Sequence, residues 1–294
     1  MAALLWTLLL PGWSAAQETV IRVDVRLVNI LATVKDGHGA LAPSLTRDDF
    51  VVLEEGRPQE IRVFDRQAGT PLAIALMVDA SLSTARDLKF EQDSAVRFLR
   101  SLVRPQDRVT LFSFTHDVTQ VCDFTSDLAR LERALRSIHS DGGTSLYDAV
   151  FLAASQLRQR EGRHVIILVT DGGDTTSTVD FHQALRAAQQ ADAVIYSVII
   201  VPIPGESGRN TAGEHALINL SEGTGGRAFQ PHLAADLDPV FREIEAELRT
   251  QYVLGFYPQH VRGAPSYRRL EVRSTNPSFT VQARKGYYFR EELP

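Results

Sequence analysis

Residues 72–78, Leu-Ala-Ile-Ala-Leu-Met-Val, form an unbroken apolar run that ends at Asp79. A run of this length without alternation is typical of a strand buried on both faces, as at the centre of a parallel sheet. Such strands present ligand-binding groups in the loop that follows their carboxyl end. Here that loop carries one carboxylate and two hydroxyls at alternate positions, Asp79, Ser81 and Ser83. The pattern predicts a site lined by oxygen atoms.

Between residues 70 and 250 strand-like and helix-like segments alternate, which is the mark of an α/β fold with a mostly parallel sheet. Strands are expected at 72–78, 109–115, 118–124, 165–170, 193–201 and 226–229, and helices at 85–103, 127–138, 146–160, 179–191, 213–221 and 234–250. The second and third strands are separated only by a tight turn at His116 and Asp117, so we expect them to pair antiparallel. Ser126 and Ser145 are expected to act as N-caps.

Both ends of the chain instead show the period-two pattern of β-strands. In residues 20–34 the apolar phase switches at Val28, which suggests a bulge or a strand that passes between sheets. Segments 50–53 and 61–64 flank a turn-like Glu-Gly-Arg-Pro sequence and are expected to form a hairpin. Three further strands are expected at 252–257, 268–273 and 279–284.

Neither of the two terminal β segments alone would form a stable sheet, because a sheet of two or three strands is only marginally stable. We therefore predict that residues 20–66 and 251–290 build one small all-β sandwich. The α/β domain of residues 70–250 would be inserted between its halves, which is possible because domain termini often lie close together.

Composition narrows the class of protein. The 294 residues are 44% hydrophobic and 23% charged, with a net charge of −5, as in an ordinary globular chain. Basic residues form no stripe with interleaved aromatics, so no nucleic-acid partner is expected. The single cysteine, Cys122, excludes an intrachain disulfide and a cysteine-based zinc cage, and we expect it to be buried and inert.

The amino terminus resembles an export signal. Residues 1–16 contain a short apolar run, a Pro-Gly break and small residues suited to signal peptidase. This run is too short to span a bilayer, which takes roughly 20 residues. We therefore expect a periplasmic or secreted protein with no transmembrane segment in the mature chain.

Two further segments supply oxygen donors at predicted element ends: Gly142-Gly-Thr144-Ser and Val169-Thr-Asp171-Gly-Gly. With the first loop, they resemble the metal-ion-dependent adhesion site of von Willebrand factor type A domains, which have a Rossmann-like fold. The resemblance implies a Mg²⁺ or Mn²⁺ site. The candidate ligands are Asp79, Ser81, Ser83, Thr144 and Asp171.

The flanking segments extend the resemblance to almost the whole mature chain. Residues 45–56, 251–258 and 284–288 resemble a bacterial family of exported von Willebrand factor A-related proteins, abundant in acidobacteria. That resemblance implies no defined activity.

The donor set indicates how such a site would work. Mg²⁺ prefers near-octahedral oxygen coordination, and two carboxylates with three hydroxyls leave a position open. The Asp or Glu carboxylate of a protein partner would fill it, so the expected function is non-catalytic binding. A metal-dependent hydrolase using the same ion and a structural domain with an unoccupied site are the alternatives.

Three neighbouring residues are expected to have structural roles. The carboxylate of Asp148 should interact favourably with the dipole of the helix in whose first turn it lies, and Gly142 and Gly143 should allow the backbone turn that brings Thr144 inward.

Overall fold

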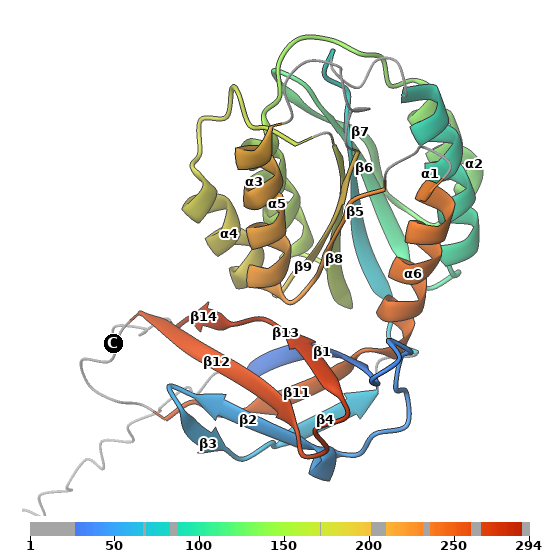
Figure 1. The fold of residues 1–294 in the computed structure, drawn as a ribbon. Coiled ribbons are helices and arrows are strands. Elements are labelled where there is room, and N and C mark those ends of the chain that lie inside the picture. The colour runs from blue at the N-terminus through green and yellow to red at the C-terminus, as the bar shows by residue number, and fades with distance from the viewer. Residues whose placement is uncertain are drawn as a thin grey trace, which may run out of the picture.

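The computed structural model describes residues 27–66, 69–82, 88–170, 172–200, 210–231, 236–259 and 266–289. These residues form a helix-covered sheet and, beside it, a β-sandwich (Figure 1). The expected signal peptide, residues 1–16, and most of the first expected strand lie outside the described residues.

The larger part of the molecule is a six-stranded sheet in the order β10-β9-β8-β5-β6-β7. Its strands are β5 (Leu72–Asp79), β6 (Arg108–Phe114), β7 (Val118–Thr125), β8 (Arg163–Thr170), β9 (Val194–Ile199) and β10 (Ala228–Phe229). Neighbours pair in parallel except β6 and β7, which are antiparallel. The predicted α/β fold with one antiparallel hairpin is confirmed.

Helices cover both faces of this sheet (Figure 1). They are α1 (Leu88–Leu102), α2 (Leu128–Arg136), α3 (Leu146–Leu157), α4 (Phe181–Gln190), α5 (Thr211–Thr224) and α6 (Leu237–Thr250). Helices α1, α2 and α6 pack on one face, and α3, α4 and α5 pack on the other.

Strand β5 lies in the middle of the sheet and contributes to both hydrophobic cores. Leu72, Leu76 and their alternating neighbours face α1 and α6, whereas Ala75 and Met77 face α3. Every residue of the strand is buried. This two-sided burial explains why its sequence lacks the polar alternation of a half-exposed strand.

Two four-stranded antiparallel sheets form the sandwich, in the orders β13-β1-β11-β4 and β14-β12-β2-β3. The strands are β1 (Val28–Lys35), β2 (Phe50–Glu54), β3 (Arg57–Gln59), β4 (Val63–Arg66), β11 (Tyr252–Phe256), β12 (Tyr267–Ser274), β13 (Thr280–Ala283) and β14 (Gly286–Tyr288). A short 3₁₀ turn, Arg47–Asp49, precedes β2. Strand β1 pairs with β11 and β13, and β2 pairs with β12, so both ends of the chain build each sheet. The predicted sandwich is confirmed.

The expected hairpin between segments 50–53 and 61–64 is wrong. Strand β2 turns back at Glu55 and Gly56, both with positive φ, and pairs with β3. A two-residue turn of this kind brings the next residues into register at once. Pro58 is accommodated because β3 is an edge strand. Strand β4 instead pairs with β11 in the other sheet.

Of the two predicted N-caps, Ser126 is wrong, and Ser145 has the predicted position without the capping bond. Asp127, not Ser126, caps α2, and its carboxylate accepts the Arg130 amide at 3.1 Å. Ser145 does occupy the N-cap position of α3, but its hydroxyl donates to the carbonyl of His116. The hydroxyl therefore joins two loops and leaves the helix amides to other partners.

Two further expectations concern single features. Cys122 is buried in β7, and this burial raises the pKa of its thiol, as expected of an inert cysteine. In the part of the chain that the structure describes, none of the helices combines the length and apolar composition needed to cross a membrane.

A buried carboxylate links three strands of the second sandwich sheet. Glu54 of β2 accepts hydrogen bonds from Arg268 of β12, at 3.1 Å, and from Tyr287 of β14, at 2.5 Å. Both Glu54 and Arg268 are almost fully buried. Removing the carboxylate would therefore leave a buried cation without its counter-charge.

The first prediction concerns this cluster. Glu54→Ala is expected to lower the free energy of unfolding by about 3–5 kcal/mol, because breaking a buried ion pair leaves the remaining charge buried and unpaired. Urea denaturation measures the change. Glu271→Ala, which removes an exposed ion pair with Arg273 on the same strand, is the matched control and should change stability little. Equal effects of the two substitutions would contradict the prediction.

The second prediction concerns the division into domains, with residues 20–66 and 251–290 as one unit. Deleting residues 252–294 removes the strands that pair with β1 and β2. We expect the amides of residues 28–54 to lose their protection from hydrogen exchange, while those of β5 and β8 keep it. Undiminished protection of β1 in the truncated chain would show that the amino-terminal strands fold without the carboxyl-terminal ones.

Candidate metal-binding site

The predicted site lies where β5 and β8 end. These strands are parallel neighbours, so their last residues, Asp79 and Thr170, reach the same edge of the sheet. This carboxyl edge is on the side of the sheet away from the sandwich (Figure 1). The side chain of Asp79 is fully buried there.

The carboxylate of Asp79 is held on both oxygens. Oδ1 accepts the backbone amide of Ser81 at 2.9 Å, and Oδ2 accepts the Thr170 hydroxyl at 2.5 Å. The Thr170 hydroxyl in turn accepts the amide of Gly172 at 3.1 Å. These bonds fix the direction of the carboxylate and tie the loop after β5 to the loop after β8.

The loop that carries Thr144 is bonded to the loop after β5. The amide of Asp141 donates to the carbonyl of Ala80 at 2.8 Å, and the amide of Leu82 donates to that of Gly142 at 3.5 Å. Gly142 has a φ of 27°, in the region that favours glycine, as expected for its turn. Thr144, two residues further on, is buried with an exposure of 6%.

A run of hydroxyl residues after β8 anchors Thr144 and the start of α3. The amide of Thr144 donates to the Thr175 hydroxyl at 2.8 Å, and the Thr175 amide returns a bond of 2.8 Å to the Thr144 carbonyl. Asp174 and Ser177 accept the amide of Tyr147. These residues act on the backbone, so they hold the Thr144 loop in place.

Asp148 has a role beyond the helix dipole that its position predicts. It lies in the first turn of α3, and its carboxylate also accepts the amides of Thr178 and Val179 at 3.0 and 2.9 Å. Burial raises the pKa of this carboxyl, but the hydrogen bonds from Val179 and Thr178 together lower it by more, so the pKa lies below its ordinary value. Asp148 therefore fastens the loop after β8 to α3.

Sequence reasoning missed the anchoring residues Thr170, Thr175 and Ser177. Their signal was the density of hydroxyls around the second aspartate, in the segment Thr170-Asp-Gly-Gly-Asp-Thr-Thr-Ser-Thr178. Spacing alone does not separate hydroxyls that face an ion from hydroxyls that bond a backbone.

Three of the five candidate ligands are described. The structure brings Asp79 and Ser81 together with the loop of Thr144, while Ser83 and Asp171 lie outside the described residues. No group of three or more His, Cys, Asp or Glu side chains suited to a metal occurs among the described residues. A buried carboxylate beside hydroxyl-bearing loops fits a hard cation that takes oxygen ligands, and does not fit a thiolate or imidazole site.

Comparison with known proteins agrees with this topology. Residues 74–173 match the model of the von Willebrand factor type A domain. No curated protein matches the sequence.

Several solved structures share the fold. A von Willebrand factor type A protein from Catenulispora acidiphila has 12% identity and a TM-score of 0.53, covering 94% of this chain and 77% of its own. The proximal thread matrix protein 1 of the mussel byssus has a zinc-occupied metal-ion-dependent adhesion site (MIDAS) motif. It has 16% identity and a TM-score of 0.54, and the match covers 67% of this chain and 50% of that protein. A mutant of the PilB minor pilin from Streptococcus sanguinis has 13% identity and a TM-score of 0.50, covering 63% and 62%. Identities this low show the fold alone, which is the α/β fold of von Willebrand factor type A domains with additional antiparallel sheets.

Proposed function

We propose that this protein is a non-catalytic, exported binding module that captures an acidic group of a protein partner through a Mg²⁺ or Mn²⁺ ion. The proposed ligands are Asp79, Ser81, Ser83, Thr144 and Asp171. The observation that carries the proposal is the junction of two loops. Bonds from Asp141 and Leu82 bring the loop of the buried Asp79 against the loop that leads to Thr144.

The donor types argue for an ion that keeps an open position. The set combines two carboxylates with three neutral hydroxyls. Such a set neutralises a divalent ion but does not complete its preferred oxygen coordination. A carboxylate from a partner would supply the missing oxygen, and its charge would then be paired in a largely buried setting.

The surface beside the site suits a protein partner. Leu82 follows Ser81 directly and is 66% exposed. An exposed leucine next to a polar site can pack against a partner, and such apolar contacts supply affinity that a single carboxylate contact lacks.

The similar structures support the same kind of role. One is a minor pilin and another is a matrix protein of the mussel byssus with a zinc-occupied motif. The proposed signal peptide, residues 1–16, places this chain in the periplasm or outside the cell. Resemblance of the flanking segments to exported bacterial proteins belongs to the same proposal.

The hydrolase alternative needs a base beside the ion. His116, in the turn between β6 and β7, lies next to Gly142 and is the residue that this alternative would have to use. Its carbonyl is engaged by Ser145. No bond among the described residues orients its imidazole toward Asp79, so binding is the better-supported function.

The third prediction concerns the metal. Mg²⁺ or Mn²⁺ should stabilise the purified protein, by about 2.7 kcal/mol at a concentration about a hundred times the dissociation constant, because the ion binds only the folded state. Thermal unfolding with and without a chelator measures this. Asp79→Ala should abolish the gain.

Asp117→Ala is the matched control, since Asp117 is an exposed carboxylate in the β6–β7 turn and no proposed ligand. It should keep the full stabilisation. A wild-type melting temperature that does not change on addition of millimolar Mg²⁺ or Mn²⁺ would contradict the proposal.

The fourth prediction separates binding from catalysis. The wild-type chain should form crosslinks to a partner protein in a cell-envelope extract that contains Mg²⁺. These crosslinked products should disappear when a chelator is added, and to the same extent when Asp79→Ala or Thr144→Ala replaces the wild-type chain. A broad screen of phosphate and ester substrates should give no metal-dependent turnover. Turnover that disappears in both Asp79→Ala and His116→Ala would overturn the binding function in favour of the hydrolase.

A further inference from the structure

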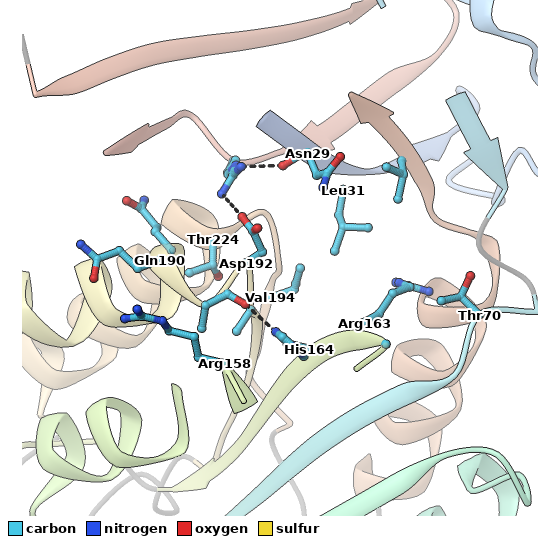
Figure 2. A pocket seen from close by; sticks show the side chains of 16 residues that line it. Asn29, Leu31, Thr70, Arg158, Arg163, His164, Gln190, Asp192, Val194 and Thr224 are labelled. Atoms are coloured by element: carbon cyan, nitrogen blue, oxygen red, sulfur yellow. Dashed lines mark hydrogen bonds and ion pairs between the residues drawn. The ribbon is translucent and has the colours of Figure 1, made fainter. Parts of the chain in front are cut away.

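A cavity of about 380 Å³ lies between the central sheet and the sandwich. Strands β8 and β9 and the end of α4 form one side, and β1 and β11 form the other (Figure 2). Its lining comprises Asn29, Leu31, Thr70, Arg158, Gly162, Arg163, His164, Gln189, Gln190, Ala191, Asp192, Ala193, Val194, Thr224, Val253 and Arg284. The volume is that of a site for a small molecule.

The cavity is separate from the candidate metal site. Arg163 begins β8 at the cavity, and Thr170 ends the same strand at the metal edge. Seven steps along a strand span roughly 23 Å. A ligand in the cavity and an ion at Asp79 would therefore not touch.

Positive charge dominates the lining. Three arginines face one aspartate, a net charge of +2 with His164 neutral, although the whole chain carries −5. Arg284 pairs with Asp192 at 3.1 Å. That pair leaves Arg158 and Arg163 without a carboxylate among the lining residues.

Arg163 is a buried cation held by neutral groups. It donates to the carbonyl of Leu248 at 2.6 Å and to the side-chain oxygen of Gln251. The nearby carboxylate of Asp107 is paired with Arg249 at 2.5 Å. Burial lowers the pKa of Arg163 to about 10, which reflects the poor solvation of its charge. Its uncompensated charge adds to the positive potential of the cavity.

Arg158 offers the accessible charge. It is exposed at the end of α3, and its guanidinium has no ion pair or hydrogen bond within the described segments. In Figure 2 Arg158 and Arg163 lie on opposite sides, with Val194 between them. A ligand bound at Arg158 would then extend over the apolar side chain of Val194.

His164 also lines the cavity, and two backbone carbonyls fix its ring. Its Nδ1 and Nε2 lie 2.5 and 2.9 Å from the carbonyl oxygens of Ala191 and Arg160.

We propose that this cavity binds a small organic acid, with its carboxylate at Arg158 and its apolar body against Leu31, Val194 and Val253. The apolar residues suit a hydrocarbon body, and the single accessible arginine suits one negative charge. The carboxyl-terminal ends of α3 and α4 also meet the cavity, and their dipoles oppose any anion there, a doubly charged phosphate more than a singly charged carboxylate.

The fifth prediction tests the cavity with benzoate and hexanoate, their neutral amides benzamide and hexanamide, and inorganic phosphate. Binding is followed by NMR titration of methyl and amide signals. At least one carboxylate should shift the signals of Leu31, Val194 and Val253 at millimolar concentration, while its amide binds far more weakly. Arg158→Gln should weaken carboxylate binding about tenfold, as expected for one charge-assisted hydrogen bond.

Arg133→Gln is the matched control, because Arg133 is also an exposed arginine in the last turn of a helix and does not line the cavity. It should bind the carboxylate like the wild type, and so should Asp79→Ala, which changes a proposed metal ligand at the opposite edge of the sheet. The proposal is overturned if neither carboxylate binds, if amides or phosphate bind as well as carboxylates, or if Arg158→Gln equals Arg133→Gln.

Discussion

The burial of β5 on both faces is the constraint on which the rest of this structure depends. Burying each of its larger side chains, such as Leu76 and Met77, stabilises the fold by about 1.5–3 kcal/mol, and the strand supplies both helical layers with core residues. A shift that drew Asp79 into the middle of the sheet would bury a charge without its hydrogen-bond partners. The carboxylate must therefore lie at the edge, where Ser81 and Thr170 meet it.

A second constraint joins the central sheet to the sandwich. Gln251 lies between α6 and β11 and is fully buried. Its amide nitrogen donates to Thr33 of β1 and to Tyr196 of β9, both at 3.1 Å, and its oxygen accepts Arg163 of β8. Buried polar groups of this kind are costly unless every bond is made, so the network favours one placement of the two parts. The cavity beside it exists because that placement is specific.

The two ends of the central sheet consequently have opposite chemistry. The carboxyl edge gathers hydroxyls around the buried carboxylate of Asp79, which suits a cation. The amino ends of β8 and β9 face the sandwich across a lining rich in arginine, which suits an anion. Since the strands are parallel, each end collects residues from several strands at once, and the two collections need not resemble each other.

The sequence by itself indicated most of the elements and one candidate site. Periodicity indicated the buried strand, the alternation of strands and helices, and the β character of both chain ends, because periodicity records which faces of a single element are buried. The candidate ligands could be identified because they lie close to predicted strand or helix boundaries.

The tertiary structure decided the features that depend on contacts between distant segments. It paired β2 with β3 and sent β4 to the other sheet, it used Ser145 to join two loops, and it added β14. It also assembled the cavity from residues as far apart in the chain as Asn29, Arg158 and Arg284. No local pattern encodes that juxtaposition, since it follows from how two finished layers pack against each other.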